Sequence, residues 1–243
     1  MTEPLLTRCP ILHRDRFLLV VDKPSGVLSH PNPGRRGEFA AFEGRYDEKA
    51  QCFESAAGRV WLMHRLDQDT SGVLLGALDA VTAGKCREAF ETDAVAKTYL
   101  AAVRGNPGRE GVWLDHLATA HERGRVRTAV VKGRSPNAEL HFRQLGYDPV
   151  RRLSLLEIRL LTGKTHQIRV QAASRQFHLL GDDVYGHFDL NRRLRAEVGL
   201  KRLFLHAARL EFKHPASGQP LRLEAALPED LATVRGRLGL AAC

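Results

Sequence analysis

The pattern of apolar and polar positions along the chain predicts many short strands, with a few helices between them. Runs of strand length, several of them alternating, occupy residues 15–24, 73–78, 97–103, 125–131, 138–145, 152–163, 208–215 and 220–228. Asp79 is expected to cap a helix that continues to Phe90, because its side chain can accept hydrogen bonds from the first backbone N–H groups. Residues 164–176 fit a helix better than a strand, and residues 229–240 predict a closing helix.

The order of these elements favours an α+β fold. Hairpin-like strand pairs outnumber β-α-β units, and we expect residues 125–131 to pair with residues 138–145 through the linker KGRSPN. This arrangement predicts a mixed, mostly antiparallel β-sheet flanked by helices. Residues 31–51 are expected to form a long irregular loop. No linker is strong enough to separate two domains, so we expect a single catalytic domain over residues 1–243.

Composition narrows the classes of protein that fit. No segment approaches the roughly 18 consecutive apolar residues that span a bilayer, and the N-terminus lacks a signal-peptide pattern, so we expect a cytoplasmic protein without membrane association. The four cysteines are widely spaced, which indicates neither a zinc site nor a redox dithiol. The chain carries 37 Lys plus Arg against 28 Asp plus Glu, a net charge of +9. Such a balance favours a polyanionic partner, of which nucleic acid is the commonest.

The polar stretch HRLDQDTSG, residues 64–72, lies between the apolar runs VWLM and VLLGAL. Residues 69–72 are of types that make turns by bonding their own backbone, so the turn does not require Asp67. Asp67 is therefore a candidate for chemistry, although a purely structural turn aspartate is the simpler alternative. Arg65 could pair with a carboxylate or a phosphate, or lie solvated at the surface.

Two further stretches carry candidate residues. In TGKTHQIR, residues 162–169, a phosphate-binding P-loop is excluded because Ile158 stands where that motif needs glycine. The helix expected here places Arg169 on its inward side, and a buried arginine needs a partner, for which Asp67 is a candidate. Tyr99 in KTYLAAV is a core aromatic, an acid or base, or a surface on which a nucleic-acid base stacks.

Taken together and in this order, the motifs resemble those of the RluA-type RNA pseudouridine synthases. The resemblance rests on VDKPSGVLSHP (21–31), H-R-L-D-x-x-T-S-G (64–72), K-x-Y-x-A-x-V-x-G (97–105), TGKTHQIR (162–169), G-D-x-x-Y-G (181–186) and RLFLHA (202–207). It covers about residues 11 to 230 and implies the pseudouridine synthase fold. It also implies isomerisation of uridine to pseudouridine in ribosomal or transfer RNA, with no cofactor and no metal.

The resemblance implies a role for each matched residue. Asp67 corresponds to the essential carboxylate, which attacks the ribose or assists loss of its proton. Tyr99 corresponds to the active-site tyrosine under the uracil, the favoured base for the final deprotonation, and Arg169 to the arginine that pairs with the carboxylate. Arg65 corresponds to an arginine that fills the space left by the flipped base. The expected substrate-binding residues are His64, Arg65, Lys164, His166 and Leu205.

Several points remain open in the sequence. Lys164 stands where the family usually has arginine, residues 176–178 read Gln-Phe-His in place of Gly-His-Pro, and Leu140 replaces a frequent threonine. The basic residues 121–127, with Lys132 and Arg134, form either an RNA-gripping hairpin or a solvated strand pair.

The wider organisation and function also leave alternatives. The resemblance starts near residue 11, so we expect no accessory RNA-binding domain before it, and we expect a monomer. The alternatives in function are a catalytically silent RNA-binding or ribosome-assembly protein on the same fold, and a glycosidase-like hydrolase that uses Asp67. Such a hydrolase normally needs a second carboxylate, and the matched motifs hold none in that role.

Overall fold

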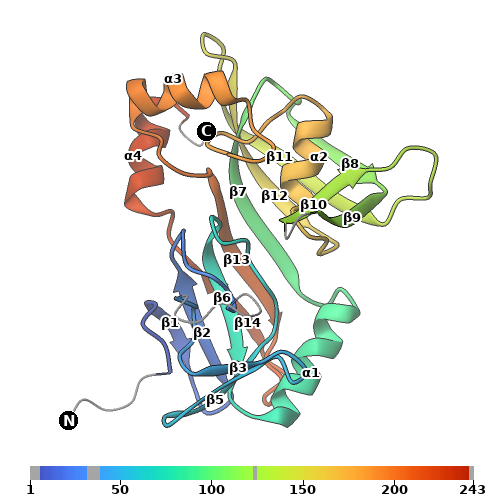
Figure 1. Cartoon of the computed structure of the whole chain (residues 1–243), viewed down its shortest axis with the longest axis vertical. Helices are drawn as coiled ribbons and strands as arrows, with labels where there is room; N and C mark the ends of the chain where they lie inside the picture. The colour runs from blue at the N-terminus through green and yellow to red at the C-terminus, as the bar shows by residue number, and fades with distance from the viewer. Residues whose placement is uncertain (1–5, 32–38, 123–124, 241–243) are drawn as a thin grey trace. The chain divides into compact units, whose positions relative to one another are not determined.

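The computed structural model describes residues 6–31, 39–122 and 125–240, and the chain divides into two compact units (Figure 1). The first unit comprises Met1–Ala96 and Ala207–Ala226, and the second comprises Lys97–His206 and Leu227–Cys243. Each unit is thus completed by a segment distant in sequence, since the chain passes from one to the other three times. The single catalytic domain expected from the sequence stays a prediction.

The first unit is built on a sheet whose order is β3-β4-β5-β6-β13, with β2 also paired to β6, β1 to β2, and β14 to β13. Its strands are β1 (Ile11–Arg14), β2 (Leu18–Lys23), β3 (Arg45–Asp47), β4 (Cys52–Ser55), β5 (Gly58–Leu62), β6 (Ser71–Ala77), β13 (Leu205–Lys213, whose first two residues belong to the second unit) and β14 (Pro220–Glu224). Strand β6 is buried at every position, as the apolar run that starts at Val73 predicts for most of its length. It pairs antiparallel with β2, with Leu18 opposite Ala77.

Helix α1 (Ala80–Glu91) covers this sheet and begins as the sequence predicts. The Asp79 side chain accepts a hydrogen bond from the Thr82 N–H at 2.8 Å, which satisfies one of the N–H groups left unpaired at a helix start. Its buried face presents Ala83 and Cys86 to a core that includes Leu75 of β6. Small side chains on the helix let it lie close to the strands.

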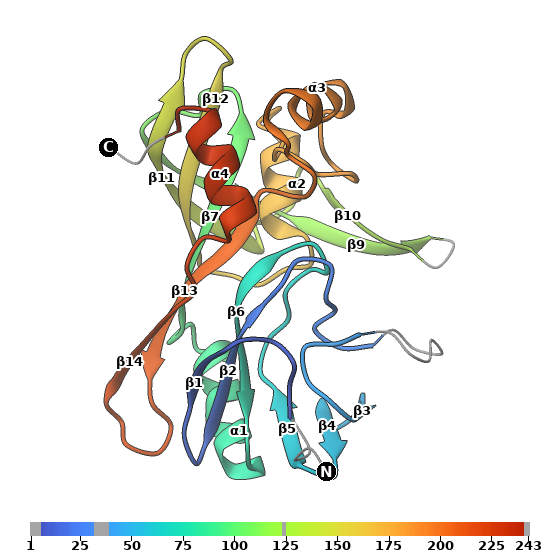
Figure 2. The ribbon, with the colours of Figure 1, turned by 90° about the vertical axis from the view of Figure 1, so that its left-hand side faces the viewer.

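The second unit contains a sheet of order β7-β12-β11-β8 and a separate two-stranded ribbon, β9-β10. Its strands are β7 (Ala96–Arg104), β8 (Glu110–Asp115), β9 (Leu117–Glu122), β10 (Arg125–Val130), β11 (Ala138–Asp148) and β12 (Leu153–Leu160), and its helices are α2 (Gln167–Ser174), α3 (Phe188–Val198) and α4 (Glu229–Arg237). Figure 2 shows α4 lying over the β7–β12 part of this sheet. Leu231 and Val234 of α4 share a core with Leu153 and Leu155 of β12.

The structure corrects three expectations. Residues 125–131 do not pair with residues 138–145: β10 pairs with β9, with Thr128 opposite Thr119, and β11 lies between β12 and β8. Helix α2 begins at Gln167 rather than at residue 164, because His166 has a left-handed backbone, φ 55°, that ends the preceding turn.

The third correction concerns residues 31–51, which are not irregular throughout, since β3 lies within them, although residues 32–38 fall outside the described residues. The expected hairpin of residues 121–127 also falls partly outside them, because residues 123–124 are not described. The helix α3, for which we made no prediction, has apolar residues four apart at Leu190, Leu194 and Val198.

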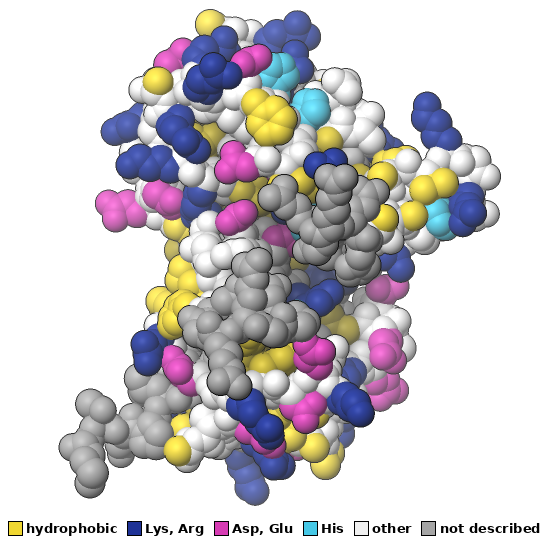
Figure 3. Space-filling model, in the orientation of Figure 1, with side chains coloured by type: hydrophobic (Ala, Val, Ile, Leu, Met, Phe, Trp, Pro, Cys, Tyr) yellow, Lys and Arg dark blue, Asp and Glu magenta, His cyan; other side chains and the backbone are white. Residues whose placement is uncertain are grey.

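The fold class predicted from the sequence is confirmed. The pairs β2–β6, β4–β5, β7–β12 and β11–β12 are antiparallel, and a parallel bridge joins Leu28 to Ala40, so the strands form mixed, mostly antiparallel sheets with helices against them. No helix in the described part of the chain combines the length and apolar character needed to cross a membrane. Figure 3 shows Lys and Arg side chains scattered over the face in view rather than gathered in one patch.

Candidate active-site residues

The loop that carries Asp67 connects β5 to β6 in the first unit. A turn closes it, in which the Thr70 N–H donates to the Asp67 carbonyl oxygen at 3.1 Å. Asp67 is half-buried, whereas Gln68 and Asp69 are exposed. The turn therefore closes on the backbone carbonyl oxygen of Asp67, although the sequence predicted a turn that does not require this residue.

A second loop, residues 24–29, holds this turn from the other side. The side chain of Lys23 is fully buried, and its ammonium group donates to the carbonyl oxygens of Pro24, Val27 and Gln68 at 2.9, 2.6 and 3.0 Å. Three carbonyl acceptors match the three donors of an ammonium group, which makes its burial possible. The Ser29 hydroxyl also donates to the Leu66 carbonyl oxygen and accepts from the Leu66 N–H. Residues on both sides of Asp67 are thus fixed by buried hydrogen bonds.

His64 and Arg65, two of the predicted substrate-binding residues, differ in their surroundings. The His64 Nε2 atom accepts a hydrogen bond from the Leu75 N–H at 3.1 Å, and its ring stacks on Phe90 at 5.2 Å. These contacts tie the start of the loop to β6 and α1. Arg65 is exposed, and its Nη1 atom donates to His30 Nε2 at 3.2 Å.

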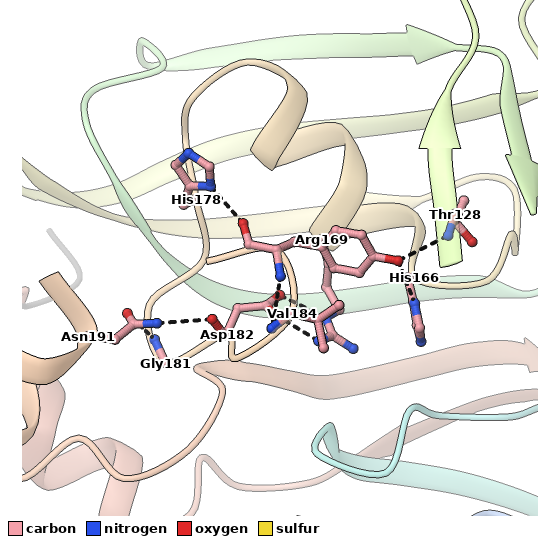
Figure 4. Close-up of polar contacts among 9 residues, drawn as sticks. Thr128, His166, Arg169, His178, Gly181, Asp182, Val184 and Asn191 are labelled. Carbon is pink, nitrogen blue, oxygen red and sulfur yellow. Dashed lines mark hydrogen bonds and ion pairs between the residues drawn. The ribbon is translucent and has the colours of Figure 1, made fainter. Parts of the chain in front are cut away.

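In the second unit, Arg169 on α2 is buried, as predicted, and forms a two-point ion pair with Asp182. Its Nε and Nη2 atoms donate to the two carboxylate oxygens, both at 2.8 Å (Figure 4). Burial alone raises the pKa of the Asp182 carboxyl, but Arg169 and the N–H groups of Val184 and Tyr185 outweigh it and lower the pKa below its ordinary value. The pair is therefore ionised at neutral pH.

Tyr185 connects this ion pair to the loop that starts α2. Its hydroxyl accepts from the Thr128 N–H of β10 at 3.1 Å and bonds His166 Nδ1 at 3.0 Å. Because the phenol already accepts from Thr128, it can donate its own proton to His166, which would place the imidazole proton on Nε2. The Arg169 guanidinium carbon lies 5.3 Å from the centre of the Tyr185 ring, a cation–π contact.

The remaining predicted residues of the second unit lie on two strands and in the loop before α2. Tyr99 is on β7 opposite Ile158 and is 8% exposed, and Leu205 is buried at the start of β13. The side chain of Lys164 is exposed, and its backbone N–H donates to the Gln167 side chain at 3.0 Å. Gln167 thereby caps the turn that precedes its own helix.

The structure brings His166 and Arg169 together through Tyr185. Asp67 lies in the first unit and Arg169 in the second, so their expected pairing stays a prediction. Sequence reasoning missed Asp182 as a partner of Arg169, although the motif G-D-x-x-Y-G contained both Asp182 and Tyr185. Among the described residues, no group of three His, Cys, Asp or Glu side chains could hold a metal ion.

Comparison with known proteins decides the family. Residues 17–174 match the family model described as RNA pseudouridylate synthase. The chain belongs to the RNA pseudouridine synthase family. It is 34% identical over 236 residues to ribosomal large subunit pseudouridine synthase D of Zymomonas mobilis, covering 94% of this chain and 72% of that protein. It is also 34% identical to tRNA pseudouridine synthase C of Pectobacterium carotovorum, covering 90% of this chain but only 59% of that protein.

The solved structures agree with this assignment. Human RNA pseudouridylate synthase domain containing 4 superposes with a TM-score of 0.68 at 26% identity, over 96% of this chain and 94% of that one. The RluA-type resemblance and the pseudouridine synthase fold expected from the motifs are therefore confirmed. Members of this family are isomerases.

Proposed function

We propose that this pseudouridine synthase family member isomerises one or more uridines of ribosomal or transfer RNA, with Asp67 as the catalytic carboxylate. The N1–C1′ bond of the uridine breaks, the uracil turns, and a C5–C1′ bond forms. The proton lost from C5 is matched by one gained at N1. The product is therefore an isomer of the substrate, and the reaction needs no other reactant. Asp67 either attacks the ribose or assists loss of its proton.

The anchoring of the Asp67 turn is the observation that carries this proposal. Its flanking residues Leu66 and Gln68 are held by Ser29 and by the buried Lys23 ammonium group. Such a carboxylate is placed before substrate arrives, which lowers the entropic cost of reaching the reactive geometry. A turn aspartate with only a structural role would not require the same support on both sides.

The other roles follow from the resemblance and from local geometry. We propose that Tyr99, nearly buried on β7, removes the C5 proton, and that Leu205 provides an apolar wall. We propose that Arg169, oriented by Asp182, stabilises the ionised Asp67. We propose that Arg65 fills the space left by the flipped base. His64, Lys164 and His166 complete the proposed substrate-binding set.

Substrate class rests on the relatives and on charge. The matched relatives include proteins named for the ribosomal large subunit and one named for tRNA. The net charge of +9 suits either RNA, because basic side chains that displace counterions from phosphates favour binding. We therefore keep both as candidate substrates.

The test uses RNA that carries tritium at uridine C5, since isomerisation releases that atom to water. Asp67→Asn should lower the rate of release by at least about 10³-fold, as removal of a catalytic nucleophile does, and leave RNA affinity nearly unchanged. The matched control is Asp69→Asn, two residues away, exposed and in the same loop, which should retain activity. Equal loss in both variants would contradict the specific role of Asp67.

Mapping pseudouridine in ribosomal and transfer RNA from a strain without this gene identifies the substrate. A site that disappears, and returns with the wild-type gene but not with Asp67→Asn, supports the proposal. A wild type that binds RNA but forms no pseudouridine favours the silent binding protein. Release of free uracil favours the hydrolase.

A further inference from the structure

The exposed Arg65 side chain is held by a histidine for which the motifs gave no role. Arg65 Nη1 donates to His30 Nε2 at 3.2 Å, although the two residues are 35 positions apart. An exposed arginine ordinarily samples many rotamers, and ordering it costs conformational entropy. A fixed acceptor beside its guanidinium group limits that freedom before RNA binds.

The hydrogen bonds of His30 define its tautomer. A guanidinium group can only donate, so Nε2 must present its lone pair to Arg65. The Nδ1 atom lies 3.0 Å from the Pro31 carbonyl oxygen, which can only accept, so the imidazole proton is on Nδ1. This tautomer of His30 therefore satisfies both neighbours at once.

Aromatic packing fixes the plane of the His30 ring. The ring stacks on Tyr46 of β3 at 5.0 Å with an angle of 15° between planes, and Tyr46 contacts Phe53 of β4 at 4.8 Å. Phe53 is fully buried. A continuous series of contacts thus runs from the core of the first unit, through two aromatic side chains and an imidazole, to the Arg65 guanidinium group.

We infer that His30 is a positioning residue that holds Arg65 ready to enter the RNA where the target uridine leaves the stack, with Tyr46 fixing the imidazole. The inference rests on the proposed function. It assigns His30 to binding of the flipped state rather than to bond making or breaking. Loss of His30 therefore raises KM and leaves kcat at saturating RNA nearly unchanged.

The experiment measures kcat and KM on the RNA that the mapping identifies. His30→Phe keeps a ring over Tyr46 but removes the acceptor, and should raise KM about 3- to 10-fold, the effect of one side chain that must be ordered on binding. His30→Gln retains an acceptor and should lose less. Tyr46→Ala should resemble His30→Phe, whereas Tyr46→Phe should lose less.

Combination with Arg65→Ala separates positioning from a general structural role. If His30 acts through Arg65, the double variant His30→Phe/Arg65→Ala should have the same KM as Arg65→Ala alone. His141→Phe removes a partly exposed imidazole on β11 and serves as the matched control, with both constants near those of the wild type. Unfolding midpoints show whether each variant folds. If His30→Phe does not fold, the comparison rests on His30→Gln and the two Tyr46 variants.

Three results overturn the inference while the proposed function stands. These are an active His30→Phe with unchanged KM, a fall confined to kcat, or an effect of His30→Phe that persists in full without Arg65. A wild type that forms no pseudouridine on any RNA overturns the proposed function and this inference with it.

Discussion

The buried ion pair between Arg169 and Asp182 gives the sharpest stability prediction. In Asp182→Asn the side chain keeps its shape and an oxygen that can accept from the Val184 and Tyr185 N–H groups, now 2.8 and 2.9 Å away. Only the charge opposite Arg169 is lost. The partners are 5% and 1% exposed, so the guanidinium group cannot turn to water.

The expected cost is about 3 to 5 kcal/mol, the usual penalty for removing one of the two charges of a buried ion pair. Asp182→Ala also removes the acceptor of two backbone N–H groups and should cost about 1 kcal/mol more for each. The matched control is Asp189→Asn on α3, whose pair with Arg192 is more than three-quarters exposed and should not change stability measurably.

Urea unfolding followed by tryptophan fluorescence measures the effect. In a Trp61→Phe background the remaining tryptophan is Trp113 of β8, which is buried and reports on the second unit. The lowered pKa of Asp182 adds a pH test: the wild type keeps this stabilisation above the ordinary carboxyl pKa and loses it as pH falls through the lowered value. Asp182→Asn should lack that acid dependence. A loss below about 1 kcal/mol at neutral pH would refute the reasoning.

Two further variants test the first unit by the same unfolding assay. Gly72→Ala should lower the free energy of unfolding by about 2 to 5 kcal/mol, because φ is +117° and a Cβ atom would collide with the Ala207 carbonyl group. The control, Gly84→Ala, lies on the open surface of α1 and should be neutral or stabilising. Equal losses of stability in the two variants would contradict this reasoning. Burial alone raises the pKa of Asp15, but bonds from two imidazoles and two backbone N–H groups lower it to about 2. The wild type should therefore lose about 1 to 2 kcal/mol of stability as the pH falls from 4 to 2, after allowance for the 31% exposure of the Asp15 side chain. Asp15→Asn should lack this loss, and an acid profile equal to that of the wild type would disprove the reasoning.

Local signals in the sequence were sufficient for several elements. The unbroken apolar run before Asp79 predicted β6, and the capping aspartate predicted the start of α1, because both depend on neighbouring residues. The partner of β10 was not predictable in the same way. Alternation shows that residues form a strand but not which strand they pair with, and the short linker to β11 is equally compatible with a hairpin.

The candidate site shows the same division. Burial of Arg169 follows from its position on the helix face, and the need for a carboxylate follows from burial. Which carboxylate it meets depends on how the turn at residues 181–186 folds back, and no periodicity encodes that. The link between Arg65 and His30 escaped prediction for the same reason, since it joins two loops that are remote in sequence.

The interleaved division of the chain has a consequence for its synthesis. Strand β6 acquires its neighbour β13 only after residue 207 has left the ribosome, although all other neighbours of β6 precede residue 97. Until then part of one edge of β6, a mostly apolar strand, has no neighbouring strand, and such an edge is the kind of surface that other chains can join. Covering this edge during synthesis would therefore keep the nascent chain from pairing with other chains before β13 is available.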